Sequence, residues 1–395
     1  MDRDTALAHA EARLAAGDAE GAFEALRPHV QGVRDDERVA LVWSRLLAHV
    51  ADEEALEGEL KRFAQLWPEH LGIALALAEA AAACLARLPF DRVHDSVLGP
   101  LGVQILGRVV DGLADEVLED QALAHAVYRG LARICAEAGE VFAARAERAF
   151  VWALEADPRV GGTWLERARF LLRRRDWAAA RSAAREAARW LAEPGPAWWM
   201  VACASTAMGD GATALEAWRN AGLSPIPGPD GLPVMGGLDP VLVLMSSRTP
   251  GPRKVGSTAD TEVVRVQPLS PTHGVILYPT VLDLAGDVSD TVLFEGTPVG
   301  FVEGTPRFVA LAVLATGPVR ALRYAASGEV EPPAGVALHP LGPRHGKLVT
   351  RLDDAGLRAV LPEALVVPEL HAGLPTGASV RRRYARLLES SDSTL

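Results

Sequence analysis

The chain has 395 residues, of which 49% are hydrophobic and 23% charged, and its formal net charge is -11 at pH 7. The apolar fraction excludes a disordered protein, the length predicts two domains, and the negative charge argues against a nucleic-acid-binding surface. The acidic excess belongs to residues 1–222, which contain 25 Lys or Arg and 34 Asp or Glu, and we interpret it as a solvated surface, with a basic partner as the alternative.

The N-terminal residues are charged and lead directly into a predicted helix, without an apolar signal region. The sequence contains no run of about 18 uncharged apolar residues. These patterns predict a cytoplasmic protein without membrane insertion, and the Ala-, Arg-, Gly- and Pro-rich composition is typical of a bacterial one. Cys84, Cys135 and Cys203 are isolated in predicted helices, so they indicate neither a disulfide nor a zinc site.

The first part of the chain predicts helices throughout. A first helix pair is indicated by small, turn and large residues at Ala10, Gly17, Asp18, Ala22 and Leu26. A second pair is predicted between Trp43 and Pro68, without a glycine turn. Residues 71–88 predict an Ala-dominated helix that must be covered on most sides, and residues 89–118 predict divergent helices.

Residues 161–223 contain the same helix-turn-helix pattern twice. Trp164 and Trp198 stand 34 residues apart. The first copy continues through Ala168, Leu171, Trp177, Ala180, Ala184 and Ala187, and the second through Val201, Ala202, Gly209, Ala214, Trp218 and Ala221. Ala146, Phe150, Ala153 and Pro158 repeat the second half of the pattern once more. An Ala-rich helical bundle is the alternative, but a fixed period over several positions is hard to obtain from helical amphipathicity alone.

This pattern resembles the tetratricopeptide repeat family, in the N-terminal half of the chain only. The resemblance implies an all-α helical solenoid over residues 1–222, in which stacked helix pairs share one core. It further implies that the first helix of each pair lines a groove that binds a partner protein or peptide. The groove residues that it implies are Leu165, Arg169, Leu172, Arg173, Trp199, Cys203 and Thr206.

Within that groove, Arg169 and Arg173 are four residues apart on one predicted helix face. They can hold a carboxylate by charge-assisted hydrogen bonds, with Trp199 as an apolar anchor beside them. The carboxylate-clamp members of the family use Lys and Asn at such positions, which argues against capture of chaperone C-termini. The alternative is that the arginines pair with neighbouring acids such as Glu166.

After the helices, residues 223–237 are rich in Pro and Gly and predict a linker at the domain boundary. Residues 246–260 predict a basic, mobile loop. Predicted strands follow at 239–245, 262–266, 274–278, 291–294, 299–302, 307–314, 319–324 and 336–339, and predicted helices at 353–363 and 379–389. Residues 238–395 are therefore predicted to form a small antiparallel β-rich domain, a barrel or sandwich, with C-terminal helices.

The β-rich half carries no metalloprotease, hydrolase, dinucleotide-binding or EF-hand motif. The basic segment 342–347 is too short for a phosphate loop, and we interpret it as an exposed turn, with anion binding as the alternative. The histidines of this half (His273, His339, His345 and His371) and its loop acids (Asp283, Asp287, Asp290, Asp353 and Asp354) have no spacing that brings them together. Arg381, Arg382, Arg383 and Arg386 form one basic helix face, which we interpret as solvated, with docking onto an acidic surface as the alternative.

We therefore predict a multidomain adaptor that binds and positions a partner protein or peptide, as a component of a larger assembly. The prediction includes no catalytic residue, cofactor or metal ion, and no nucleic-acid partner. One alternative is an enzyme with a hydrolytic or transfer site in the β domain and repeats that recruit substrate, which a convergent His-Asp site would favour. The other alternative is a structural subunit whose repeats pack on copies of themselves.

Overall fold

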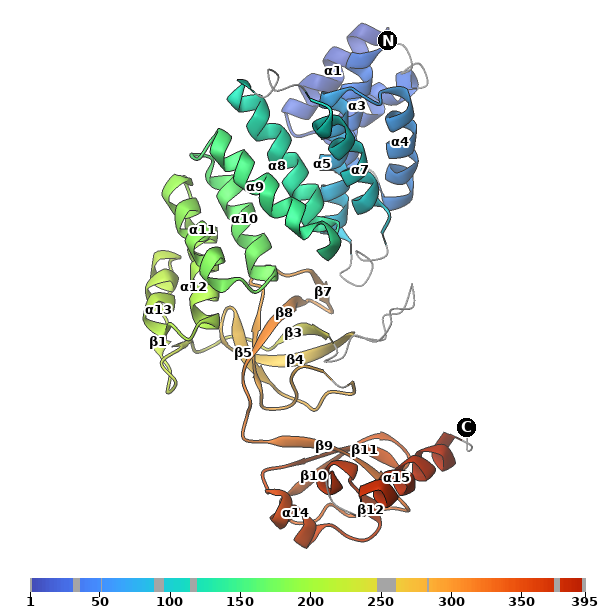
Figure 1. Ribbon diagram of the computed structural model, residues 1–395, viewed down its shortest axis with the longest axis vertical. Coiled ribbons are helices and arrows are strands. Elements are labelled where there is room, and N and C mark those ends of the chain that lie inside the picture. Colours follow the sequence, from blue (N-terminus) through green and yellow to red (C-terminus); the bar gives the residue numbers. More distant parts are fainter. Residues whose placement is uncertain are drawn as a thin grey trace. The chain divides into compact units, whose positions relative to one another are not determined.

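A computed structural model describes residues 2–30, 36–50, 52–88, 96–113, 119–246, 261–282, 284–372 and 377–392 (Figure 1). The chain separates into two compact units, Met1–Val201 and Ala202–Leu395, so the division falls inside helix α12 (Gly195–Ala207). The boundary predicted at residues 223–237 lies further along the chain and stays a prediction. The fold class is confirmed: helices come first, and a strand-rich part with a closed barrel and C-terminal helices follows.

The described residues of the first unit form helices joined by short connections. They are α1 (Arg3–Ala15), α2 (Ala19–Leu26), α3 (Glu37–Val50), α4 (Glu53–Leu66), α5 (Leu71–Arg87), α7 (Leu98–Asp111), α8 (Gln121–Glu137), α9 (Ala143–Ala156), α10 (Gly161–Arg173) and α11 (Trp177–Trp190), with a 3-10 turn at Glu140–Phe142. Neighbours in the chain pack extensively as α1–α2, α8–α9 and α10–α11. Figure 1 shows α8 to α11 as successive hairpins laid side by side.

Helix α5 is covered on most sides, as its composition predicts. Residues such as Ala78, Ala80 and Ala81 are fully buried along it, and α3, α4, α7 and α8 all pack against it. An alanine side chain is small enough to let several helices approach one backbone closely. The run of alanines therefore makes α5 the centre of the first half of this unit.

The structure confirms the 34-residue period. Helices α10 and α12 begin at Gly161 and Gly195, and α11 and α13 (Gly211–Asn220) begin 34 residues apart in the same way. The turn before each second helix repeats as well, because Arg175 and Gly209 both have positive φ. The aspartates that follow them cap the next helix by accepting hydrogen bonds from Ala179 N at 3.2 Å and Thr213 N at 3.1 Å.

The small residues of the repeat lie where its helices meet. Ala168, Ala180, Ala184 and Ala187 are completely buried in the α10–α11 hairpin. The tryptophans differ more than the pattern predicts: Trp218 is fully buried, whereas Trp164, Trp177 and Trp198 are half-buried. These rings therefore cover the edges of the packed alanines as well as filling gaps between helices.

The second unit contains the C-terminal half of α12, helix α13 and all strands of the chain that the structure describes. The strands are β1 (Ile226–Pro227), β2 (Pro233–Val234), β3 (Val241–Ser246), β4 (Thr261–Ser270), β5 (His273–Ile276), β6 (Thr291–Phe294), β7 (Gly300–Val302), β8 (Thr305–Ala315), β9 (Arg320–Ala326), β10 (Val336–Gly342), β11 (His345–Thr350) and β12 (Leu365–Val366). The predicted strands from residue 239 to residue 339 are all present, with shifted ends. The predicted loop at 246–260 lies almost wholly outside the described residues.

Five strands close into a barrel in the order β3-β4-β5-β6-β8, because β3 also pairs with β8 in parallel register. Strand β7 adds to the outer edge of β8. Inward-facing residues such as Val243, Val266, Val292 and Phe294 fill the barrel, so its interior is a packed core.

The last part of the chain forms a four-stranded sheet in the order β10-β11-β9-β12. Helices α14 (Asp354–Val360) and α15 (Gly377–Asp392) and a 3-10 turn (Pro368–His371) accompany it. Tyr324, Leu348, Leu357 and Leu370 belong to its separate core. The sequence interpretation of residues 342–347 as an exposed turn was wrong beyond residue 344, because β11 begins at His345 and buries Lys347.

Residues 223–237, predicted as a linker, contain the β1–β2 hairpin, which packs against α13 and β4. The approach is close: a Cβ added to Gly211 at the start of α13 would lie 2.0 Å from the carbonyl oxygen of Gly231. Met235 N also donates to Leu269 O of β4 at 2.7 Å. The hairpin therefore fixes α13 against the barrel, a role that the Pro and Gly content does not reveal.

A polar junction joins the barrel to the four-stranded sheet. Lys347 of β11 is buried. It donates a hydrogen bond to Thr280 Oγ1 at 2.8 Å and forms an ion pair with Asp287. Thr280 and Asp287 both lie on the loop that follows β5. Asp290 on the same loop accepts a hydrogen bond from Gly317 N at 2.8 Å, in the connection to β9. A buried ammonium group needs polar partners, and Thr280 and Asp287 supply them to Lys347.

Replacing the buried lysine tests this junction. We expect Lys347→Met to lower the free energy of unfolding by about 3 kcal/mol, because it leaves the Asp287 carboxylate partly buried without its cation. Denaturant unfolding of the full chain measures the loss. The double variant Lys347→Met/Asp287→Asn removes the charge that is left and should recover part of it. A single variant as stable as the parent chain would show that the pair contributes nothing.

Candidate binding surface on helices α8 and α10

A ladder of polar contacts joins α8 to α10, the first helices of two successive hairpins. The α8–α10 face consists of His125, Arg129, Arg133 and Glu137 on α8, and Thr163, Glu166, Arg169 and Arg173 on α10. The α8 members follow each other at intervals of four residues, and those of α10 at three or four, so each set lies on one side of its helix. The side chains therefore meet between the two helices.

The centre of the ladder is a bidentate contact between an arginine and a glutamate. Arg129 donates from Nε and Nη2 to the two carboxylate oxygens of Glu166 at 2.9 and 2.7 Å. Arg133 Nε lies 3.6 Å from the same Glu166 oxygen that Arg129 Nη2 contacts. The hydrogen bonds that Arg129 donates to Glu166 raise the pKa of Arg129, and all three side chains are about one-third exposed or less. One carboxylate is thus shared by two guanidinium groups.

The outer end of the ladder is looser. Arg173 Nη1 lies 3.4 Å from both carboxylate oxygens of Glu137, and the Arg173 side chain is 43% exposed. Beyond it, Arg174 contacts Glu140 at 2.7 Å. These contacts join residues 34 to 37 positions apart, so they connect equivalent places in neighbouring hairpins.

A contact between a histidine and a threonine lies at the other end of the ladder. His125 Nε2 lies 2.9 Å from Thr163 Oγ1, which is completely buried. Burial, with the positive charge of Arg129 as a second cause, lowers the pKa of His125. The imidazole is therefore uncharged at neutral pH, and the charge of the ladder comes from its arginines and glutamates.

The predicted groove residues fall into two groups. Leu165, Arg169 and Arg173 lie on α10, and Arg169 and Arg173 share its face with Glu166. Trp199 is half-buried in the N-terminal part of α12. The predicted alternative partner Glu166 contacts Arg129 and Arg133, while Arg173 contacts Glu137. Sequence reasoning missed the α8 members, although their four-residue spacing and their position one repeat before α10 could have indicated them.

Cys203 and Thr206 are buried in the second unit. Their exposed fractions are 2% and 1%, and Thr206 Oγ1 donates to Ala202 O of its own helix at 2.9 Å. Burial raises the pKa of the Cys203 thiol, whose polar neighbours are Thr272 and Glu295 of the barrel. The structure therefore places these two side chains in packing between helix and barrel instead of on an open surface.

A buried Ser-His pair lies in the same region. The Ser270 hydroxyl and His273 Nδ1 are 2.6 Å apart, both residues are completely buried, and burial lowers the pKa of His273 to about 4. A nucleophile and base must meet their substrate, and neither atom here reaches solvent. The pair therefore supports the turn between β4 and β5 and offers no reactive surface.

The loop acids of the β-rich half hold backbone and basic groups. Asp353 caps α14 by accepting from Gly356 N at 2.7 Å, and Asp354 contacts Arg320 at 2.8 Å. Asp287 and Asp290 hold the barrel junction. Among these described acids, no hydrogen bond or ion pair reaches a histidine, and Asp283 lies outside the described residues. The convergence that would favour an enzyme is thus not observed for these residues.

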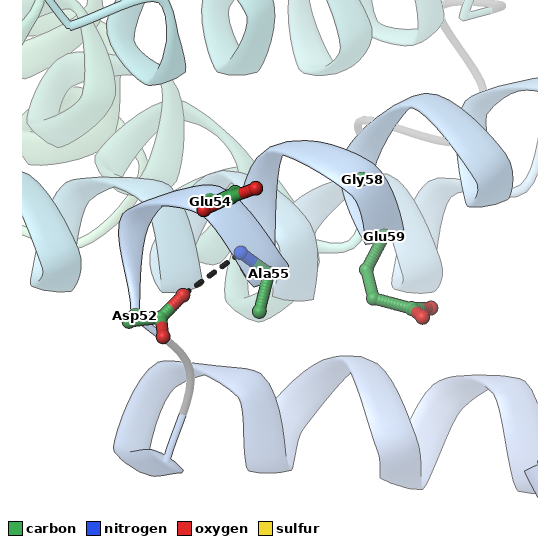
Figure 2. Close-up of a pocket in the computed structure, with 5 residues that line it drawn as sticks. All are labelled: Asp52, Glu54, Ala55, Gly58 and Glu59. Carbon is green, nitrogen blue, oxygen red and sulfur yellow. Dashed lines mark hydrogen bonds between the residues drawn. The ribbon is translucent and has the colours of Figure 1, made fainter.

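An acidic hollow lies at the N-terminal part of α4, and the aspartate that lines it caps this helix. It is lined by Asp52, Glu54, Ala55, Gly58 and Glu59 (Figure 2). Asp52 accepts a hydrogen bond from Ala55 N at 2.8 Å, and Glu59 contacts Arg62 at 3.4 Å.

Within the described ranges, no group of three or more His, Cys, Asp or Glu side chains is placed to hold a metal ion. None of the helices in those ranges is long and apolar enough to cross a membrane.

Comparison with known proteins finds a structural likeness but no sequence match. No protein-family model and no curated protein sequence matches it. Among solved structures, one titled as the functional characterization of PilF from Pseudomonas aeruginosa has a TM-score of 0.40 and 13% sequence identity. That match covers 54% of this chain and 88% of the PilF chain.

A pair of double-mutant cycles tests the ladder. We expect a coupling of about 1 kcal/mol between Arg129→Ala and Glu166→Ala, because two hydrogen bonds share one half-buried carboxylate. The matched cycle between Arg173→Ala and Glu137→Ala should give less than about 0.5 kcal/mol, since that contact is longer and more exposed. Unfolding free energies of the single and double variants give both values. Equal coupling energies in the two cycles would contradict the prediction that the Arg129–Glu166 contact is the stronger one.

The buried imidazole predicts a pH dependence. The unfolded chain binds a proton at His273 near pH 6.5, whereas the folded chain does so only near pH 4. The free energy of unfolding should therefore fall as pH falls, by about 2 kcal/mol between pH 6.5 and pH 5. In the His273→Gln variant, the free energy of unfolding should not show this decrease as pH falls. Denaturant titrations at several pH values compare the two proteins, and identical slopes would show that His273 does not cause the loss.

Proposed function

We propose that this protein is an interaction adaptor that holds a partner protein or peptide on the α8–α10 face and acts by binding and positioning, without a covalent step. The observation that supports the proposal is the ladder itself. Its charged side chains stay partly exposed, and contacts between hairpins fix their positions. A surface of arginines held in this way loses little side-chain freedom on binding a partner.

Under this proposal, Arg169, Arg173 and Leu165 of α10 contact the partner together with Arg129 and Arg133 of α8. Trp199 adds an apolar contact. Cys203 and Thr206, which are buried, are left out of the proposed surface. The β-rich unit gives the chain a second surface, so that two components of one assembly can be joined.

Capture from an extract of the source cells tests the proposal. We expect the intact chain to retain a partner that Arg169→Glu/Arg173→Glu loses, because reversing two neighbouring charges repels the group that they bind. The control is Arg185→Glu/Arg189→Glu, which makes the same change with the same spacing on exposed positions of α11. The control should retain the partner.

Two outcomes would contradict the proposal. A partner that all three proteins retain equally would place the binding surface elsewhere on the chain. A partner that is also retained by a fragment containing only residues 202–395 would assign the binding to the β-rich unit. Circular dichroism of each variant confirms that the helices are intact before the comparison is made.

A further inference from the structure

Strand β7 forms an open edge of the barrel sheet. The barrel closes between β3 and β8, so its five strands leave no edge among themselves. Strand β7 ends the sheet, and among the described residues it pairs with β8 alone (Figure 1). An edge strand presents unpaired N–H and C=O groups, and proteins usually protect such an edge with a proline, a bulge or a covering element.

The four-stranded sheet has this protection, whereas β7 lacks it. Strand β10 contains Pro340 and a register shift beside it, and helix α15 packs against β12 at the opposite edge. Strand β7 consists of Gly300, Phe301 and Val302, without a proline or a charged side chain. Phe301 is 68% exposed and Val302 is 43% exposed. An apolar edge of this kind can receive a further strand.

The backbone of Phe301 faces this open edge. Phe301 lies opposite Pro306 of β8, which has no N–H, so the Phe301 carbonyl accepts no hydrogen bond from its neighbour. In an antiparallel pair, the two groups of one residue point to the same side, so the Phe301 N–H also points away from β8. Glu303 and Gly304 both have positive φ and form the tight turn that holds β7 against β8. The edge is therefore extended before any partner binds.

A cation lies beside the same edge. Arg307 of β8 is opposite Gly300, and a Cβ added to Gly300 would lie 3.6 Å from Arg307 Nη2. The guanidinium group thus lies against β7 where Gly300 leaves space. Arg307 Nε is buried without a hydrogen-bond partner. The ion pairs within the described β-rich unit join Arg320, Lys347 and Arg358 to aspartates, and none of them includes Arg307.

We infer that β7 binds an extended segment of another protein, which adds a strand to the barrel sheet and carries an acidic residue next to an apolar one. Backbone hydrogen bonds with Phe301 hold the segment as a strand. Successive residues of a strand face opposite sides of the sheet. The apolar residue therefore packs on the Phe301 ring, while the neighbouring carboxylate takes a charge-assisted hydrogen bond from Arg307 on the other side.

A second copy of this chain lacks the chemistry that Arg307 requires. Antiparallel pairing of two β7 strands about Phe301 sets Gly300 against Val302 of the other copy, so neither brings a carboxylate to Arg307. The segment therefore belongs to a different protein. Strand β7 lies in the second unit and the α8–α10 face in the first, so this inference and the proposed function can fail separately.

The probe that tests this inference is a fluorescein-labelled peptide, Ser-Thr-Thr-Glu-Val-Thr-Thr-Ser, mixed with the full-length protein and followed by fluorescence anisotropy. One comparison peptide has Gln in place of Glu, and the other has Pro in place of Val. We expect the Glu peptide to bind about tenfold more tightly than the Gln peptide, because only a carboxylate pairs with Arg307. The Pro peptide should not bind measurably, since proline removes a donor from the strand. Equal binding of the three peptides would overturn the inference.

Variants of the protein test the two contacts. Arg307→Gln removes the cation, so this variant should bind the Glu and Gln peptides equally. Phe301→Ser removes the apolar contact and should weaken binding of the Glu peptide severalfold. The matched control Leu341→Ser changes an exposed apolar residue on edge strand β10 and should leave binding unchanged. Thermal unfolding checks that each variant is folded. An Arg307→Gln variant that still prefers the Glu peptide, or a control as weak as Phe301→Ser, would contradict the inference.

Hydrogen exchange locates the added strand. Pairing protects the Phe301 N–H, so exchange of residues 299–304 should slow when the Glu peptide is bound. Protection confined to other parts of the chain would place the peptide elsewhere and overturn the inference. Sedimentation of the protein alone tests self-pairing, and a dimer that Phe301→Ser abolishes would assign the edge to a second copy instead.

Discussion

The end of helix α12 is buried on every side, and its packing within the second unit is the constraint that organises that unit. Residues 202–206 at the end of α12 are all buried, which is more than one helical turn, so the helix is covered on every side. Barrel residues Thr272 and Glu295 lie beside Cys203, and the β1–β2 hairpin packs against α13. Helix α13 and the end of α12 therefore belong to the same compact unit as the strands.

The helices of the first unit are held by two kinds of contact. Alanines such as Ala168 and Ala180 let helices within a hairpin approach closely, while charged side chains such as Arg129 and Glu166 join successive hairpins near the surface. Polar contacts between repeats stay partly hydrated, which avoids the cost of burying charge. They join successive hairpins while the charged side chains stay partly exposed.

Buried polar groups in the β-rich unit serve structure. Lys347 joins the four-stranded sheet to the barrel through Asp287, and Ser270 supports His273 at a tight turn. Each lies where two elements meet, and its partner is another residue of the chain. The candidate function therefore rests on the partly exposed α8–α10 face and not on a pocket of the barrel.

The sequence by itself determined the helices, their 34-residue period and most strands, because these depend on local spacing: Trp164 and Trp198 mark the repeat, and Gly and Pro turns separate the short strands. It also indicated Arg169 and Arg173 as neighbours on one helix face. Only the tertiary structure decided that Arg173 meets Glu137, that Arg129 and Arg133 complete the face, and that Cys203 and Thr206 are buried. Such facts depend on which elements pack together over long separations in the chain, and no local period encodes that.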